Sequence, residues 1–406
     1  MASNLLYNAF GKDLNICCIS KLSRRDEGDK QLMKERCFEM KLGGFTRISI
    51  LFLLGVVLVA PVFLSACSTG ASNSEGKMSI TNEAGTTSES ADSTSTANTS
   101  AEPISGTDMF FDTVVTITLY GEDKQQYIDE CFDLARYYEN LFSNTVEESD
   151  ISRINAAAGE FVEVDPETIE LLNAGLEYGE ISNGRFDITV GKLSDLWHFS
   201  ENDGEVPDDS DISQVIANID DAAVVIKDHT VALINPEAKL DLGGIAKGYI
   251  ADRMRDHLKS EGITSGIINL GGNVVVIGNK PDGSMYKVGI QKPFSDQNDV
   301  IAYVETDEKS VVTSGVYERY FYVDDTLYHH ILDLSTGYPA ETGLNSVTII
   351  SENSVDGDGL STTCFLLGVA EGMKLIESMP DVEAVFITDD NEIKCTSGVG
   401  NSLVVL

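Results

Sequence analysis

The pattern of apolar and polar positions along the chain changes near residue 108. Before it, one long apolar run lies in polar sequence. After it, apolar residues recur at helical intervals or alternate in short runs. The helical spacing predicts helices over 124–142, 150–157, 166–181, 243–260 and about 359–378, with Pro166 as a favourable first helical residue. These segments are the expected helical part of a folded domain.

Short runs rich in β-branched and aromatic residues predict the strands. The first covers 113–120, a hairpin is expected at 222–226 and 231–234, and further strands follow between 267 and 351 and after residue 382. Blocks of strands separated from the helices are typical of an α+β fold with largely antiparallel sheets and packed helices, and they argue against a doubly wound parallel sheet. Residues 108–406 are therefore expected to form this domain, as one unit or two intertwined lobes.

The long apolar run near the start of the chain resembles the core of a secretion signal. An uncharged run over 48–64 follows Lys41 and Arg47, and it ends in Leu64-Ser65-Ala66-Cys67. Small residues directly before a cysteine are typical of a bacterial lipoprotein signal, here 40–66, with Cys67 as the lipidated residue. A transmembrane anchor is the alternative, since the run is near the lower limit for crossing a bilayer.

The segments on either side of this signal carry little information about a fold. Residues 1–39 are polar and precede a signal that should begin the chain, so we predict that translation starts at Met40. Residues 67–107 are rich in Ser, Thr, Gly and Ala and contain few large apolar residues, which predicts a flexible tether. The expected location is the extracytoplasmic face of the membrane, reached through a lipid anchor.

The charge of the chain excludes one class of partner. The formal net charge is -38 at pH 7, and such a surface repels DNA and RNA. It would also repel an anionic nucleotide, so a nucleotide site needs local basic residues or a metal ion. No CxxC motif or histidine-rich cluster suggests zinc.

One strand-to-helix turn has the features of an anion site. An apolar strand, 240–242, runs into Gly243 and Gly244, and the helix that follows carries Lys247 in its first turn. Small residues let a ligand approach the backbone, and the N–H groups at a helix start favour an anion. The alternative is an ordinary turn with a solvated lysine.

A second helix start could bind a metal ion. Asp358 and Thr362 are four residues apart, so they lie on one face of the helix and could direct two oxygen atoms at Mg²⁺. The alternative is that Asp358 caps the helix N-terminus and Thr362 is an ordinary residue of the first turn.

Two strand ends carry groups suited to catalysis or phosphate binding. His329 and His330 end one predicted strand, where a histidine is a candidate general acid or base, and an exposed or hydrogen-bonded pair is the alternative. Thr313, Ser314 and Gly315 end another, where they could hold phosphate or ribose or simply turn the chain.

Two further segments could contact a flat ligand. Asn269 precedes a double glycine between two strands, which permits close approach of a ligand or forms a sheet bulge. Asp187 lies in a loop followed closely by Trp197, the only tryptophan. Trp197 could stack on an aromatic ligand or anchor the core.

The order of these segments along the chain is a more specific indication of function than any single segment. GRFDITVGKLSDLW, LDLGGIAKGYIADR, NLGGN, TSGVYERY, HHILDLSTGYPA and DGLSTT follow one another in the chain. Together they resemble the ApbE family of FAD:protein FMN transferases over essentially all of 108–396. The resemblance implies an ApbE-like, T-fold-like architecture. It also implies Mg²⁺-dependent cleavage of FAD, release of AMP, and transfer of FMN to a threonine of an acceptor flavoprotein. Such an acceptor is typically a subunit of a membrane redox complex.

The resemblance also assigns roles to residues. It implies metal ligation by Asp358, Thr362 and the backbone carbonyl of Ala246, and it makes His330 the base for the incoming threonine, with Asp187 beside it in the catalytic set. The residues that it implies in FAD binding are Gly243, Gly244, Lys247, Asn269, Thr313, Ser314 and Gly315, to which we add Trp197. Some members of the family mainly hydrolyse FAD to FMN and AMP, and a non-catalytic flavin-binding lipoprotein is a further alternative.

The chain departs from the family pattern in two places. Phe111-Asp112-Thr113 stands where Met-Gly-Thr is usual, and Leu334 and Ser335 stand where Pro and Arg are usual. The first departure changes the backbone and charge at one end of the expected flavin site. The second removes one positive charge, and neither removes an expected metal ligand.

Overall fold

The structure is a computed structural model that describes residues 102–199, 204–296 and 299–406. The predicted signal peptide, Cys67 and most of the predicted tether lie outside the described residues. The predicted start of the domain at 108 is wrong. Strand β1 (Pro103–Phe110) begins earlier and pairs along its whole length with β2 (Thr113–Tyr120). Small and polar residues, Ser105 to Asp108, occupy the middle of this strand, so its apolar pattern is weak.

The largest element is an eight-stranded sheet whose neighbouring strands all run antiparallel, which confirms the predicted α+β class. The strand order is β1-β2-β6-β7-β10-β15-β16-β17. The strands after β2 are β6 (Gly266–Leu270), β7 (Asn273–Ile277), β10 (Ser310–Gly315), β15 (Leu344–Ser351), β16 (Glu383–Thr388) and β17 (Ile393–Cys395).

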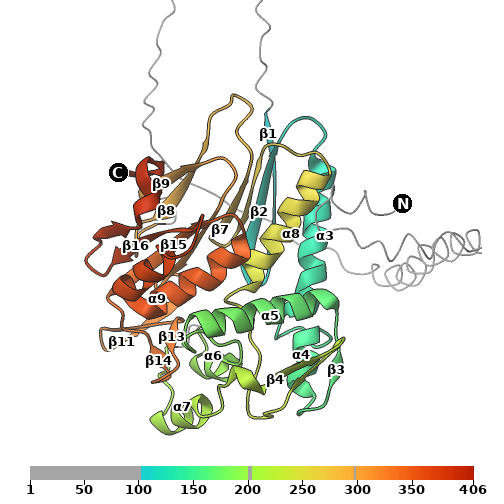
Figure 1. Cartoon of the computed structure of the whole chain (residues 1–406), viewed down its shortest axis with the longest axis vertical. Helices are drawn as coiled ribbons and strands as arrows, with labels where there is room; N and C mark the ends of the chain where they lie inside the picture. Colours follow the sequence, from blue (N-terminus) through green and yellow to red (C-terminus); the bar gives the residue numbers. More distant parts are fainter. Residues whose placement is uncertain (1–101, 200–203, 297–298) are drawn as a thin grey trace, which may run out of the picture. The chain divides into compact units, whose positions relative to one another are not determined.

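Three helices cover one face of this sheet (Figure 1). They are α3 (Gln125–Phe142), α8 (Ala246–Ser260) and α9 (Ser354–Ile376). α8 packs against both of the others, and α9 packs against β10 and β15. By length and composition α9 could cross a membrane, but its Leu360, Cys364 and Phe365 are buried in the core of this domain.

A smaller sheet covers the opposite face of the large one. It contains β8 (Tyr286–Gln291), β9 (Val300–Thr306) and β18 (Leu403–Val405). Its apolar residues pack with Val276, Val311 and Val385 of the large sheet. The middle of the large sheet is therefore buried on both faces, which explains why every residue of β15 is buried.

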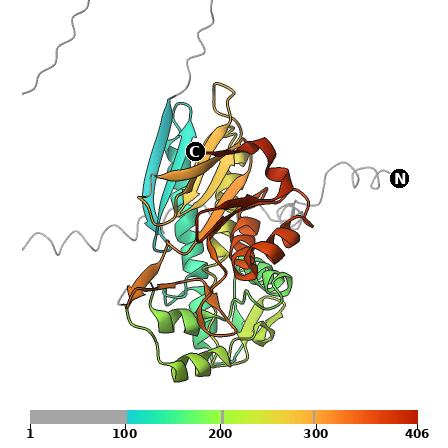
Figure 2. The same ribbon diagram turned by 90° about the vertical axis from the view of Figure 1, so that its left-hand side faces the viewer.

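The remaining elements form the region drawn in green below the sheet in Figures 1 and 2 and the short strands beside it. The helices are α4 (Asp150–Ala156), α5 (Pro166–Ile181), α6 (Gly191–Trp197) and α7 (Asp209–Ile216), with a 3-10 turn at Asp221–Ala223. A second 3-10 turn, Ser397–Ser402, lies outside this region against β16, β9 and β18. The strands are β3 (Val162–Glu163), β4 (Val224–Lys227), β5 (Thr230–Leu233), β11 (Tyr320–Val323), β12 (Thr326–His329), β13 (Leu332–Asp333) and β14 (Tyr338–Pro339). One core cluster runs through both the sheet region and this region.

Two predicted elements near the expected site differ from the structure. The helix expected from about residue 359 begins at Ser354, because its first turn is Ser-Val-Asp-Gly, which lacks a helical apolar pattern. The strand expected at 328–332 is broken into β12 and β13, so His330 lies between two strands. In contrast, β2 and α5 have the predicted bounds.

Candidate functional site

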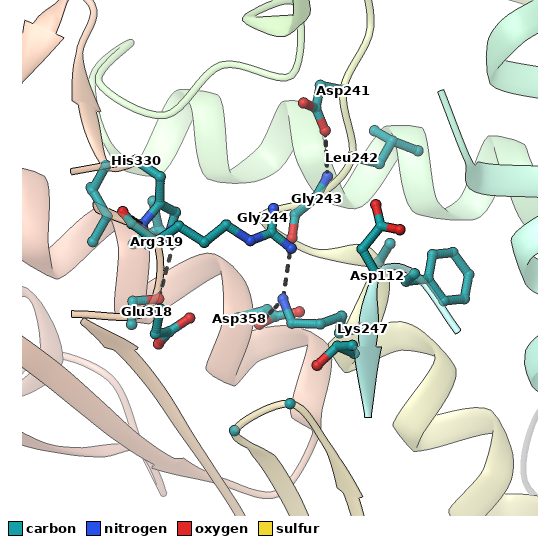
Figure 3. Close-up of a pocket in the computed structure, with 18 of the residues that line it drawn as sticks. Asp112, Asp241, Leu242, Gly243, Gly244, Lys247, Glu318, Arg319, His330 and Asp358 are labelled. Atoms are coloured by element: carbon teal, nitrogen blue, oxygen red, sulfur yellow. Dashed lines mark hydrogen bonds and ion pairs between the residues drawn. The ribbon is translucent and has the colours of Figure 1, made fainter. Parts of the chain in front are cut away.

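A cavity of about 1390 Å³ lies where the start of α8, the middle of α9, the end of β10 and the β12–β13 junction meet (Figure 3). Most residues that the sequence predicts for the site line it, although they come from segments far apart in the chain. They are Asp187, Gly243, Gly244, Ala246, Lys247, Asn269, Thr313, Ser314, His330, Asp358 and Thr362.

The crossing of α8 over α9 builds one wall of this cavity. A Cβ atom at Gly248 would lie 2.2 Å from the Ser354 carbonyl oxygen, so only glycine allows the two helices to come this close. The Gly248 N–H donates to Asp358 Oδ2 at 2.7 Å. The close crossing therefore positions the Asp358 carboxylate at the N-terminal turn of α8.

Asp358 is a buried carboxylate inside a helix and not a helix cap. α9 begins at Ser354 after Asn353, which puts Asp358 in the second turn, so the capping alternative is wrong. Its side chain is 4% exposed, and the Lys247 ammonium lies 3.7 Å from Oδ1. Burial raises the pKa of Asp358, and the Lys247 charge opposes that rise.

The glycine turn before α8 lines the cavity, and several of its polar groups make hydrogen bonds within the fold. Gly243 N–H donates to Asp241 Oδ1 at 2.8 Å, and the Gly243 carbonyl accepts from Lys247 Nζ at 3.3 Å. No side chain caps α8, because its capping position is held by Ile245. The N–H groups of Ala246 and Gly248 donate to the Leu242 carbonyl and to Asp358, so the positive charge at this turn comes mainly from Lys247, which lines the cavity.

The oxygen atoms near Asp358 suit a hard cation. Thr362 Oγ1 lies 3.3 Å from Ser314 Oγ, which is 2.8 Å from Ser361 Oγ, and the Ala246 backbone lines the same cavity. Within the described ranges no group of three or more His, Cys, Asp and Glu side chains comes together. One carboxylate with neutral oxygen donors fits Mg²⁺, which usually takes few protein carboxylates together with substrate phosphates.

His330 lies across the cavity from this wall. The backbone N–H of His330 donates to the Arg319 carbonyl oxygen at 3.1 Å, and the ring Nδ1 lies 3.3 Å from the same oxygen. A proton on Nδ1 satisfies that contact and leaves Nε2 unprotonated, as a base requires. The pKa of His330 is lowered well below its ordinary value. Burial by the cavity walls is the larger cause, and the charge of Arg319 is the next largest.

The neighbouring His329 has a different environment. It is 6% exposed, its ring packs edge-on against Phe365, and it does not line the cavity. Burial lowers the pKa of His329 to about 4. Of the two adjacent histidines, His330 is therefore the candidate base.

Trp197 and Gly315 were predicted to bind FAD, but both have structural roles. Trp197 is fully buried, donates from Nε1 to the Gly337 carbonyl at 2.8 Å and stacks on Phe199, so it is a core anchor and the stacking prediction is wrong. Gly315 does not line the cavity. A Cβ there would lie 2.7 Å from the Tyr317 ring, so Gly315 makes room for that ring.

Asp187 lies in the cavity wall, but both of its oxygen atoms are used within the fold. Oδ1 accepts from the N–H and the hydroxyl of Thr189 at 2.7 Å each, and Oδ2 accepts from Asp221 N–H at 3.1 Å. Burial raises the pKa of Asp187, while these hydrogen bonds oppose the rise. This geometry favours a positioning role that holds the loop, and it argues against the predicted catalytic role.

Two cavity residues were missed by the reasoning from sequence, although they stand in the TSGVYERY motif. Glu318 and Arg319 follow the end of β10 in a turn, and both face the cavity (Figure 3). Glu318 Oε1 accepts from the Gly315 N–H at 3.1 Å. Protein surrounds Glu318 although water reaches it through the cavity, and this enclosure raises its pKa. The sequence did contain a signal for them, because two adjacent charged residues within a motif at a strand end indicate a ligand site.

The two departures from the family pattern also lie at this cavity. Phe111 and Asp112 form the turn between β1 and β2 with φ of 52° and 54°, and Asp112 lines the cavity. Asp333 Oδ1 accepts from the N–H and the hydroxyl of Ser335 at 2.9 and 2.7 Å. A side-chain hydrogen bond therefore holds the second turn in place of proline.

Comparisons with known proteins agree with this site. The model of the ApbE family matches residues 111–386. The FAD:protein FMN transferase of Klebsiella pneumoniae is 37% identical over 286 residues, which cover 70% of this chain and 88% of the relative. That of Treponema pallidum is 33% identical over 295 residues, covering 69% and 82% of the two chains.

A solved structure shows the same fold. The ApbE protein of Thermotoga maritima superimposes with a TM-score of 0.68 at 34% identity, covering 73% of this chain and 98% of that one. The matched family model, the relatives and the fold lead to one conclusion. The chain belongs to the ApbE family.

Proposed function

We propose that this chain is an FAD:protein FMN transferase that cleaves the FAD pyrophosphate, releases AMP and attaches FMN to a threonine hydroxyl of an acceptor flavoprotein. The observation that carries the proposal is the arrangement of the cavity. The Lys247 ammonium at α8, a buried carboxylate on α9 and the His330 ring line one cavity large enough for a dinucleotide. The names of the relatives point to the same activity.

The proposed reaction is one phosphoryl transfer. The acceptor hydroxyl oxygen forms a bond to the phosphorus of the FMN half while the bond from that phosphorus to the AMP oxygen breaks. His330 Nε2 accepts the hydroxyl proton, and AMP leaves with the electron pair of the broken bond. Lys247 and the first turn of α8 bind the pyrophosphate oxygens and keep the two halves in position.

The proposal includes Mg²⁺ at the α9 wall. Asp358, Thr362 and the carbonyl of Ala246 are the residues that would hold it, since all three line the cavity and offer oxygen donors. Bound there, the ion would neutralise charge on the phosphates. This supplies the local positive field that a chain of net charge -38 needs for an anionic substrate.

Hydrolysis of FAD is the second candidate activity. Water reaches Glu318 through the cavity, so His330 could also accept a proton from water in place of a protein hydroxyl. A flavin carrier without catalysis is less consistent with the site, because binding alone requires no base.

The test is an incubation of the chain with FAD, Mg²⁺ and a candidate acceptor protein. AMP release and covalent flavin fluorescence of the acceptor in a denaturing gel are followed together. We expect both signals. AMP without labelled acceptor would show a hydrolase, and bound FAD without AMP would show a carrier. His229→Asn is a suitable control, because His229 is exposed in the β4–β5 turn and does not line the cavity.

We also propose that the chain is lipid-anchored at the extracytoplasmic face through Cys67, which would bring it near membrane redox proteins as acceptors. The support is the Leu-Ser-Ala-Cys pattern after an apolar run. The test is metabolic labelling with a fatty acid and membrane fractionation. Loss of both signals in Cys67→Ala is expected, and labelled Cys67→Ala would exclude this anchor.

A further inference from the structure

Arg319 is a charged side chain that the proposed reaction has not used. It follows Glu318 in the turn after β10, is exposed, and lines the cavity. In Figure 3 its side chain extends from the side of His330 toward the side of the cavity that carries Gly244 and Lys247. Its backbone is held, because its carbonyl accepts the His330 N–H at 3.1 Å.

The guanidinium of Arg319 has no hydrogen bond or ion pair among residues 102–199, 204–296 and 299–406. Arg185, on another wall of the cavity, donates to the Leu366 carbonyl, and four described arginines are paired with carboxylates. Arg136 binds Asp133, Arg253 binds Glu170, and Arg255 binds Asp252. A free guanidinium is unusual where acidic residues outnumber basic ones by 66 to 28.

A lack of nearby acids does not explain the free guanidinium. Carboxylates that line the same cavity include Asp112, Asp241, Glu318 and Asp358. Each of the last three already accepts a backbone hydrogen bond, from Gly243, Gly315 and Gly248 respectively. These backbone hydrogen bonds orient three of the carboxylates, and none of the four forms a hydrogen bond or ion pair with the Arg319 guanidinium.

Arg319 and Lys247 act on the same groups. The charge of each lowers the pKa of both Glu318 and His330, so the two cations approach one region from different walls. A guanidinium binds phosphate oxygens in a bidentate manner, while an ammonium acts as a compact point charge. The pair is chemically suited to an anion with several oxygens.

We propose that Arg319 is a phosphate-binding residue that grips the pyrophosphate opposite Lys247 and stabilises the charge that gathers on the departing AMP. This inference rests on the proposed function, since it assigns Arg319 to the same substrate. It adds no new bond to the reaction. The guanidinium stays protonated and donates hydrogen bonds to non-bridging oxygens, more strongly as the phosphorus–oxygen bond breaks.

The experiment compares the chain with Arg319→Ala, Arg319→Lys and the control Arg136→Ala, which removes an exposed arginine of α3. Flavin fluorescence measures the binding of FAD and of riboflavin, which lacks phosphate. AMP release with Mg²⁺ and acceptor gives kcat and KM, and thermal melting checks that each variant is folded.

For Arg319→Ala we expect weaker FAD binding, unchanged riboflavin binding and a loss in kcat/KM on the order of 100-fold. Arg319→Lys should recover part of this loss, because it keeps the charge but not the fork of donors. Arg136→Ala should match the unchanged chain.

Two results would overturn the inference while leaving the proposed function intact. One is AMP release by Arg319→Ala at the rate of the unchanged chain. The other is an equal loss of FAD and riboflavin binding, which would show a structural role. Failure of the proposed function is distinguishable, because the unchanged chain would then release no AMP.

Discussion

The two walls of the cavity are built in different ways. The α8–α9 wall is buried and held by the close crossing at Gly248, and its Asp358 carboxylate is 4% exposed. The opposite wall consists of the turn after β10 and the β12–β13 junction, and its Glu318 and Arg319 are exposed. A rigid wall suits binding of the phosphates, whereas a solvent-accessible wall suits proton transfer and entry of an acceptor. Five predictions test this division.

The largest effect is expected at the buried wall. Asp358→Asn keeps the volume of the side chain but removes its charge, so Mg²⁺-dependent AMP release should fall by a factor on the order of 1,000. Its melting temperature should stay the same or rise, because burying an ionised carboxylate is costly. Unchanged AMP release would show that Asp358 is not a metal ligand. The control is Asp211→Asn, an exposed position on α7, which should leave AMP release unchanged.

His330 should carry the chemistry of the exposed wall without contributing to binding. His330→Gln should lower kcat by a factor on the order of 100 to 10,000 and leave the dissociation constant of FAD near its original value. Steady-state kinetics and fluorescence titration measure the two quantities. A large loss of FAD affinity would mean that this wall also binds the substrate through His330.

The pH dependence of kcat/KM tests the role of His330 as a base. Because the pKa of His330 is lowered, the imidazole stays neutral and able to accept a proton at pH values where an ordinary histidine, with a pKa near 6.5, is protonated. We expect kcat/KM to show no loss between pH 7 and about pH 6. A fall centred near pH 6.5 that His330→Gln abolishes would contradict this environment for His330.

Gly248→Ala tests whether the close helix crossing builds the buried wall. The added methyl would meet the Ser354 backbone at 2.2 Å, so we expect a loss of about 1–3 kcal/mol in the free energy of unfolding. FAD turnover should fall with it, since Asp358 would shift. Denaturant unfolding measures the first effect, and Asp256→Ala, an exposed change on the same helix, should leave both unchanged.

The smallest effect is expected at the β1–β2 turn, at the edge of the cavity. Asp112 has φ of 54°, so Asp112→Gly should stabilise the fold by about 1 kcal/mol and should change KM for FAD, because a cavity carboxylate is lost. Asp123→Gly is a matched control with φ of 56° outside the cavity. It should gain similar stability with KM unchanged. An equal shift of KM in both variants would contradict a contact at Asp112.

The sequence predicted the buried wall better than the exposed one. Lys247, Asp358 and Thr362 stand on helices whose periodicity is visible, so their spacing indicated shared faces. Glu318 and Arg319 lie in a turn, where no periodicity reports which way a side chain points. Trp197 was misassigned because an aromatic residue beside a loop has the same sequence pattern whether it stacks on a ligand or fills a core. Strand β1 was missed because small and polar residues, Ser105 to Asp108, interrupt its apolar pattern.

The most direct test of the account is a crystal structure of the His330→Gln variant with FAD, in which turnover is slow enough to trap the substrate. We expect the pyrophosphate to lie between the first turn of α8 and the turn of residues 316–319, with Lys247 and Arg319 on opposite sides of it. A pyrophosphate bound elsewhere, with both of these side chains free of contact, would contradict the central claim that the two walls meet around the phosphates of FAD.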